Sequence, residues 1–202
     1  MDIVLATRNK KKVEEIRKIL EAAGVSFRIF TLDDFPKCPE VEEDGDTFEK
    51  NAVKKAVQIS RCTGLTAVAD DSGLEVEALN GAPGVFSARY AGENADDGAN
   101  CEKLLHEMKD VPSDKRKARF VCCISMAFQD NVRTFFGYVE GRIGTEPHGE
   151  KGFGYDPLFY PGGSGSTFAE MEDHEKNAIS HRAGALTALQ KYLKEAGGEL
   201  YR

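Results

Sequence analysis

Six consecutive residues near the N-terminus have side chains suited to binding phosphate: Thr7, Arg8, Asn9, Lys10, Lys11 and Lys12. They follow a short apolar run over residues 3–6 and precede a stretch with apolar residues at helical spacing. A junction between a strand and a helix presents free backbone N–H groups and the positive end of the helix dipole, which favour anions. The pattern predicts a phosphate site, with a solvated basic first turn of a helix as the alternative.

Two adjacent carboxylates, Asp70 and Asp71, are followed by Ser72 and Gly73. A short strand is predicted over residues 66–69, ending at this pair. Because neighbouring residues of a strand point to opposite faces, only one of the two carboxylates can reach a given ligand, and the other serves the structure. Such a carboxylate can hold Mg²⁺ while water and substrate phosphates complete the coordination. An ordinary Asp-Ser-Gly turn is the alternative.

Residues 33–50 form an acidic segment, with eight acidic residues, two basic residues and two prolines, and we predict that most of it is a loop. The next helix is expected to begin at Asp46, with Glu49 completing a capping box. On this helix Lys55 falls within the apolar sector, with Asn51 one turn before it. Its ammonium group therefore either extends to solvent or points into a cleft.

Two segments near the C-terminal end carry further polar groups in unusual positions. Phe153, Gly154, Tyr155 and Asp156 lie in a glycine-rich stretch, and such a loop can place a ring against a nucleotide base or simply form a tight turn. Ser180 is predicted to cap the last helix, so that His181 and Arg182 occupy its first turn. Cations there oppose the helix dipole, which favours an anion or a carbonyl oxygen in front of them.

Several other kinds of chemistry are excluded. The sequence contains no Walker motif, no GxGxxG, no GxSxG nucleophile elbow and no HExxH zinc motif. The net charge of −7 argues against binding to nucleic acid backbones. No apolar run approaches the length of a membrane span, and the N-terminus turns basic early, so we expect a cytoplasmic protein that binds no membrane. The five cysteines form no CxxC pair and are predicted to be buried thiols.

The remaining elements point to an α/β fold. A helix is predicted from about Asp96, and two alternating apolar segments, residues 118–128 and 132–143, are joined by turn residues 129–131. These two segments are expected to form a long antiparallel ribbon within a mixed sheet.

Taken in this order, five segments resemble the Ham1-like family of nucleoside triphosphate pyrophosphatases: LATRNKKKVEEI, EEDGDTFEKNAVKKA, ADDSGLEVEALNGAPGVFSARYAG, KGFGYDPLF and EKNAISHRAGAL. The resemblance implies a single domain over residues 1–202, with an elongated mixed sheet and two lobes that flank a deep cleft, and a homodimer. It also implies Mg²⁺-dependent hydrolysis of deaminated purine nucleoside triphosphates, ITP, dITP and XTP, to the monophosphate and pyrophosphate.

The resemblance further implies roles for individual residues. Asp71 would be the proton acceptor and a metal ligand together with Glu43, although Glu42 is the alternative ligand. The positions that would bind substrate are Thr7, Arg8, Asn9, Lys10, Lys11, Lys12, Lys55, Ser72, Phe153, Gly154, Tyr155, Asp156, Lys176, His181 and Arg182. Two other functions fit parts of the pattern: a Maf-type pyrophosphatase for modified pyrimidine nucleotides, and a nucleotide-binding sensor without turnover.

Overall fold

The computed structural model describes residues 1–22, 28–129 and 131–195. Within them a six-stranded sheet has the order β2-β1-β3-β4-β5-β6. Strand β1 pairs in parallel with β2 and β3, and β5 pairs antiparallel with β6, which confirms the mixed sheet of an α/β fold. The strands are β1 (Asp2–Leu5), β2 (Arg28–Phe30), β3 (Thr66–Val76), β4 (Lys117–Phe128), β5 (Asn131–Ile143) and β6 (Phe159–Pro161).

The helices in the described residues are α1 (Lys10–Ala22), α2 (Phe48–Thr63), α3 (Asp97–Glu107), α4 (Asp173–Ile179) and α5 (His181–Glu195). Short 3₁₀ turns are η1 (Leu32–Asp34), η2 (Glu77–Leu79), η3 (Gly84–Arg89) and η4 (Ser113–Lys115). Helix α3 starts as predicted, because the Asp96 side chain accepts a hydrogen bond from the backbone N–H of Ala99 at 2.8 Å. The predicted cap of α2 is wrong by one residue: Thr47 accepts from the N–H of Lys50 at 3.1 Å, while Asp46 pairs with the Lys50 ammonium.

The chain divides into two compact units. The first comprises residues 1–71, 122–137 and 182–202, and the second comprises residues 72–121 and 138–181. Strands β3, β4 and β5 supply residues to both units. The long strands β4 and β5 are neighbours in the sheet, as expected for the predicted ribbon. Each unit has its own apolar core.

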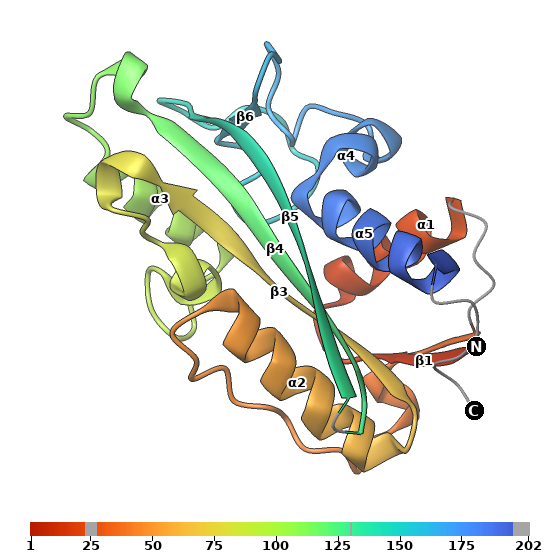
Figure 1. Cartoon of the computed structure of the whole chain (residues 1–202). Helices are drawn as coiled ribbons and strands as arrows, with labels where there is room; N and C mark the ends of the chain where they lie inside the picture. The colour runs from red at the N-terminus through yellow and green to blue at the C-terminus, as the bar shows by residue number, and fades with distance from the viewer. Residues whose placement is uncertain (23–27, 130, 196–202) are drawn as a thin grey trace. The chain divides into compact units, whose positions relative to one another are not determined.

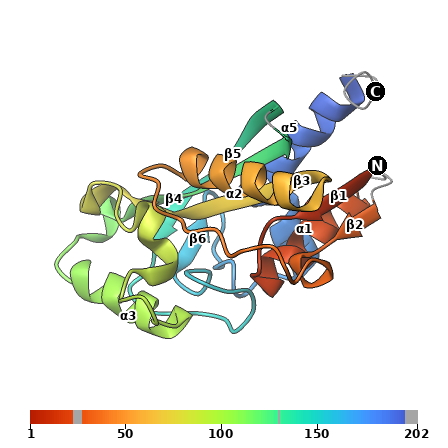
Figure 2. The ribbon, with the colours of Figure 1, turned by 90° about the horizontal axis from the view of Figure 1, so that it is seen from below.

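In the first unit helices cover both faces of the sheet. One face packs against α1 and α5 through residues such as Ile16, Leu20 and Leu186, which cluster with Leu5 and Val68 of the strands. The other face packs against α2, which runs along β3 in both views (Figures 1 and 2). Alternate residues of β1 and β3 therefore point to different layers, as the period of a strand requires.

The core of the second unit is rich in aromatic rings. Phe120 packs edge-on against Phe159 with ring centroids 4.7 Å apart, and Phe168 lies 5.2 Å from Phe159. Helix α3 contributes Leu104 to the same cluster. No helix in the described part of the chain is long and apolar enough to cross a membrane.

Strand β3 is longer than the sequence indicated. We expected it to stop at residue 69, but it continues to Val76, so that Asp70 and Asp71 lie within it. Charged residues normally interrupt a buried strand because desolvation of an unpaired charge is costly. Here cationic side chains lie against both carboxylates, and these cations come from segments distant in sequence.

The expectation that all five cysteines are thiols is wrong for two of them. Cys38 and Cys62 form a disulfide with a sequence separation of 24, and Cys38 lies in the acidic loop while Cys62 is near the end of α2. Motif spacing cannot detect this pair, because the fold of the loop along α2 brings the two residues together. The other three are buried thiols as predicted: Cys101, Cys122 and Cys123.

Candidate functional site

The predicted phosphate loop lies at the N-terminus of α1, in the first unit. Asn9 caps the helix: its Oδ1 accepts from the backbone N–H of Lys12 at 3.1 Å, and Thr7 Oγ1 accepts from the N–H of Asn9 at 3.2 Å. Arg8 donates to the carbonyl of Cys38 at 3.2 Å, which links the loop to the acidic segment. Lys10 and Lys11 are exposed, whereas the side chain of Lys12 turns inward and is only 16% exposed.

Lys55 lies at the centre of the acidic residues and does not extend to solvent. Its ammonium donates to Glu43 Oε1, to the backbone carbonyl of Asp70 at 2.8 Å and to Asp71 Oδ1 at 3.4 Å. Burial acts to lower the pKa of Lys55, but the carboxylates of Asp71 and Glu43 outweigh it and raise the pKa. Lys55 is therefore a buried ammonium held between two carboxylates.

Glu43 and Asp71 offer the donor atoms that Mg²⁺ prefers. Both carboxylates contact the Lys55 ammonium, while the Glu42 side chain is exposed. Asp71 Oδ2 is buried and has no hydrogen-bond partner among the described residues. Among the described residues, no cluster of three or more His, Cys, Asp or Glu side chains is arranged to hold a metal ion. A two-carboxylate site nonetheless fits Mg²⁺, which keeps several waters and uses substrate phosphates as ligands.

The two adjacent aspartates of β3 have opposite environments, as the alternation of a strand predicts. Asp71 faces Lys55, and burial raises its pKa although Lys55 and Lys12 act in the other direction. Burial also acts to raise the pKa of Asp70, but Arg182 and Lys12 hold that pKa well below its usual value. Asp70 is thus a permanent anion at neutral pH, and Asp71 is the carboxylate whose proton affinity is increased.

A small cavity in the first unit is lined by several of the predicted site residues. It has a volume of about 90 Å³, and its lining includes Thr7, Arg8, Glu43 and Lys55. Predicted phosphate-binding and metal-binding residues, far apart in the sequence, therefore line one space.

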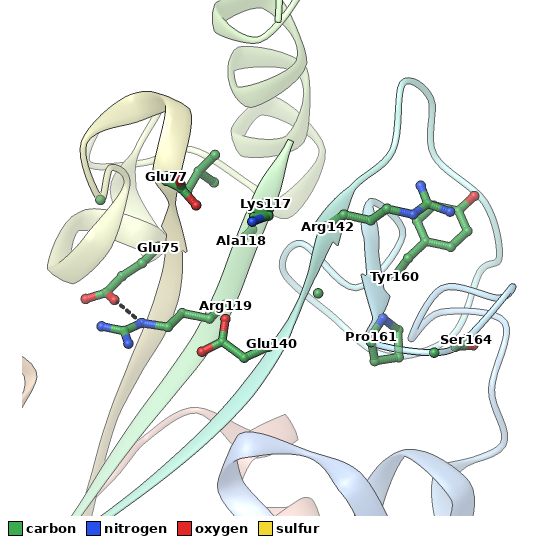
Figure 3. A pocket seen from close by; sticks show the side chains of 15 residues that line it. Glu75, Glu77, Lys117, Ala118, Arg119, Glu140, Arg142, Tyr160, Pro161 and Ser164 are labelled. Carbon is green, nitrogen blue, oxygen red and sulfur yellow. Dashed lines mark hydrogen bonds and ion pairs between the residues drawn. The ribbon is translucent and has the colours of Figure 1, made fainter. Parts of the chain in front are cut away.

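A larger cavity of about 670 Å³ lies in the second unit, and none of the predicted site residues lines it. Its wall is the polar face of β3, β4 and β5, where Arg119 pairs with Glu75 at 2.7 Å beside Glu140 (Figure 3). Arg142 stacks over the Tyr160 ring at 4.1 Å from its centroid (Figure 3). We place the candidate site at the smaller cavity, because Thr7, Glu43 and Lys55 line it and Lys55 also contacts Asp71.

The second unit positions the glycine-framed aromatic segment. Asp156 Oδ2 accepts from the backbone N–H of Phe153 at 2.8 Å and from the Lys176 ammonium at 2.7 Å. Gly152 has φ +72°, and a Cβ there would lie 2.1 Å from Asp156 Oδ2, so the turn requires glycine. The Lys176 ammonium also lies 4.8 Å from the centroid of the Phe153 ring.

The remaining predicted base-binding residues differ in how accessible they are. Tyr155 is 3% exposed and its hydroxyl donates to the carbonyl of Ser87 at 2.9 Å, so its ring belongs to the core. Phe153 is half-buried. His181 stacks on Phe120 with an interplanar angle of 12° and ring centroids 4.8 Å apart. His181 is also buried, at 5% exposed, so of these three rings the half-buried Phe153 is the most open to a flat ligand.

Arg182, predicted to bind substrate, is 1% exposed and is held by carboxylates of the first unit. Its Nε donates to Asp70 Oδ2 at 2.9 Å, and another nitrogen donates to Glu15 Oε2. Sequence reasoning missed Glu15 altogether. Its spacing of three residues after Lys12 places both on one side of a helix, which was the available signal.

The chain is similar to proteins of one family over almost its whole length. A model of the Ham1 family matches residues 3–192. The dITP/XTP pyrophosphatase of Geobacter sulfurreducens is 52% identical over 198 residues, with 98% of each chain covered. That of Bacillus subtilis is 45% identical over 194 residues, covering 96% of this chain and 97% of the relative. Among solved structures, a HAM1 protein from Coxiella burnetii has a TM-score of 0.87 and 42% identity, covering 96% of this chain and 99% of that chain. The Staphylococcus aureus Ham1 protein has a TM-score of 0.86 and 41% identity, covering 97% of this chain and 100% of that chain.

Proposed function

The chain belongs to the Ham1 family, and on this premise we propose that it hydrolyses the deaminated purine nucleoside triphosphates ITP, dITP and XTP to the monophosphate and pyrophosphate. The observation that carries the proposal is the buried Asp71 carboxylate: its Oδ2 has no hydrogen-bond partner among the described residues, and its Oδ1 contacts the Lys55 ammonium. Cleavage of a phosphoanhydride by water needs positioning and charge neutralisation more than a protein nucleophile. A carboxylate beside buried cations supplies both.

We assign Mg²⁺ to Glu43 and Asp71, because these are the two carboxylates that meet at Lys55. When bound, the ion would supply positive charge to the phosphates and help to orient them. The protein's own groups do the rest. Asp71 orients the attacking water and accepts its proton, a role suited to a carboxylate whose pKa is raised by burial.

The cations of the first unit take the triphosphate. The N-terminus of α1 offers its backbone N–H groups over the loop of residues 7–12, together with the exposed Lys10 and Lys11. Lys12 and Lys55, both largely buried, counter the charge that develops on the leaving pyrophosphate. Buried cations act more strongly than exposed ones because less water screens them.

Discrimination between bases follows from hydrogen-bond donors. We assign the base to Phe153, the segment up to Asp156, Lys176 and His181, with Ser72 and Arg182 also contributing to the nucleotide site. Hypoxanthine and xanthine carry a 6-oxo acceptor, which a histidine or arginine N–H can satisfy. Adenine presents an amino group at that position and leaves donors facing a donor, which is costly in a site built for an acceptor.

The proposed function is tested by incubating the protein with ITP and MgCl₂ and identifying the product. Release of pyrophosphate supports it, whereas release of orthophosphate, or ITP binding without turnover, contradicts it and in the second case favours a sensor. The same assay with XTP, GTP and ATP measures selectivity, and we expect kcat/KM for ATP at least about 100-fold below that for ITP. Turnover of modified pyrimidine nucleotides in place of ITP would favour a Maf-type enzyme. The names of the relatives do not favour such an enzyme.

We also propose that the whole chain acts as one pyrophosphatase domain, and that it forms a homodimer in the cytoplasm with no nucleic acid or membrane partner. The support for the dimer is the family resemblance. Light scattering coupled to size-exclusion chromatography measures the oligomeric state directly, and a mass near the 22.2 kDa of one chain would contradict it.

A further inference from the structure

The carboxylate of Asp70 joins three elements of the first unit. Its Oδ1 lies 2.5 Å from the ammonium of Lys12 on α1, and its Oδ2 accepts from Arg182 Nε on α5 at 2.9 Å. Cys122 of β4 also donates to Oδ2, at 3.0 Å. The Asp70 side chain itself is fully buried. Both of its oxygens are therefore occupied by groups of the protein.

Asp70 lies on the opposite face of β3 from Asp71, and its side chain contacts Lys12 and Arg182, whereas the side chain of Asp71 contacts Lys55. The contacts of Asp70 with Lys12 and Arg182 make it part of a chain of alternating charges: Glu15, Arg182, Asp70 and Lys12. The Arg182 and Asp70 side chains are 1% and 0% exposed, and the Lys12 side chain at the end of the series is 16% exposed. The Glu15 side chain at the other end is 14% exposed, so two fully buried ions lie between two partly exposed ones, and the Lys12 end of the series is at the phosphate loop.

Lysine side chains are flexible, and a lysine holds a fixed position only where an anion anchors it. The Lys12 ammonium has such an anchor in Asp70. Arg182, in turn, fixes the orientation of the Asp70 carboxylate, because it donates to Oδ2 and also contacts Oδ1 at 3.4 Å. A carboxylate held in this way presents one oxygen to Lys12 in a constant direction.

We infer that Asp70 is a positioning residue: it touches neither metal nor nucleotide, and it acts by holding the Lys12 ammonium at the phosphate loop. The inference rests on the proposed function for the identity of the substrate. The competing explanation is that Asp70 only stabilises the fold, because a buried arginine needs an ionised partner. The two explanations differ in whether the effect of Asp70 on phosphate binding depends on Lys12.

A double-mutant cycle separates them. Asp70→Asn, Lys12→Met and the double variant are compared with the wild type for kcat/KM with ITP and Mg²⁺. If Asp70 acts through Lys12, we expect Asp70→Asn to lower kcat/KM by about 10- to 100-fold alone and less than about 2-fold in the Lys12→Met background. An equal loss in both backgrounds would overturn the inference and leave a structural role.

A second readout keeps the inference testable independently of turnover. The dissociation constant of inorganic tripolyphosphate, measured by calorimetry with Mg²⁺ for the same four proteins, should show the same dependence on Lys12. A wild type that releases no pyrophosphate from ITP contradicts the proposed function alone. A wild type that releases pyrophosphate, with independent effects of the two substitutions on tripolyphosphate binding, contradicts this inference alone.

Two further variants keep the inference testable if Asp70→Asn does not fold. If Asp70→Asn fails to fold, Asp70→Glu keeps the charge for Arg182 but moves the oxygens by one methylene, and its effect should likewise depend on Lys12. The matched control is Arg116→Lys, which alters another buried arginine, one that donates to backbone carbonyls of the second unit, and should leave kcat/KM within about 2-fold of wild type. Loss of activity in that control at temperatures where it remains folded would show that disruption of any buried arginine suffices, against the inference.

Discussion

The two units each bury an arginine, and they satisfy it in different ways. Arg182 in the first unit donates to the carboxylates of Asp70 and Glu15. Arg116 in the second unit donates to the backbone carbonyls of Ile143 at 2.9 Å, Met108 at 2.7 Å and Gly144 at 2.6 Å. Burial lowers the pKa of Arg116, whereas for Arg182 the nearby carboxylates outweigh burial and raise the pKa.

This difference shows what each cation contributes. Carbonyl oxygens are neutral, so Arg116 ties together the ends of neighbouring segments without creating another buried charge. The carboxylates around Arg182 are ions that attract further cations, and one of these is Lys12 in the phosphate loop. A buried arginine with ionised partners therefore extends an electrostatic network to the candidate site, while one with carbonyl partners remains a local structural element.

The largest expected effect is that of replacing Asp71, a carboxylate of the first unit, on turnover. Asp71→Asn keeps the shape of the side chain but removes the proton acceptor and a metal ligand, so we expect kcat for ITP to fall by about 100- to 10,000-fold. Binding of ITP should largely survive, because the lysines of the phosphate loop are untouched. Steady-state kinetics and calorimetry measure the two quantities. Turnover near that of wild type would contradict the role of Asp71.

The comparison between the two buried arginines is tested by replacing each one and measuring the free energy of unfolding. Arg182→Met removes the buried guanidinium that Asp70 and Glu15 share, although Asp70 keeps its contact with Lys12, and we expect a loss of about 3–5 kcal/mol in the free energy of unfolding. Arg116→Met leaves neutral carbonyls unsatisfied, which costs less, about 1–3 kcal/mol. Urea denaturation of both variants gives the two values. A larger loss for Arg116→Met would reverse the comparison.

The disulfide of the first unit should have an effect of intermediate size. Cys62→Ser removes the disulfide between Cys38 and Cys62, which are separated by 24 residues in the sequence. For a closed loop of this length we expect a loss of about 2–4 kcal/mol in the free energy of unfolding. Thermal unfolding of the wild type with and without dithiothreitol provides the matched measurement. A melting temperature that is the same under both conditions, and the same for Cys62→Ser, would show that the link does not stabilise the unit.

The smallest effect concerns two of the three buried thiols, Cys101 of the second unit and Cys123 of the first. Burial raises the pKa of both Cys101 and Cys123 to about 12, so the reactive thiolate is scarce in the folded protein at pH 8. We expect iodoacetamide to leave both unmodified unless urea is added, as mass spectrometry of the digested protein would reveal. Thiolate formation, and with it reactivity, should increase only as the pH approaches 12. Rapid alkylation at pH 8 without denaturant would contradict the burial of these residues.

Local patterns predicted many elements because their causes are local. The helix from about Asp96, the ribbon of β4 and β5 and the helix after Thr7 each depend on side-chain period and on polar groups within a few residues. The alternation of a strand likewise predicted that Asp70 and Asp71 would have different partners. The length of β3 could not be predicted in this way, because two aspartates read as the end of a strand until their counter-ions are known.

The sequence by itself determined the α/β class, the family and the set of candidate residues, since these depend on residue types and their order. Only the tertiary structure decided which of those residues meet. In the structure Lys55 lies between Glu43 and Asp71, Tyr155 packs in the core, and Cys38 is bonded to Cys62. The physical reason is that charge pairing and burial depend on distances between segments far apart in the chain, and a linear sequence does not contain those distances.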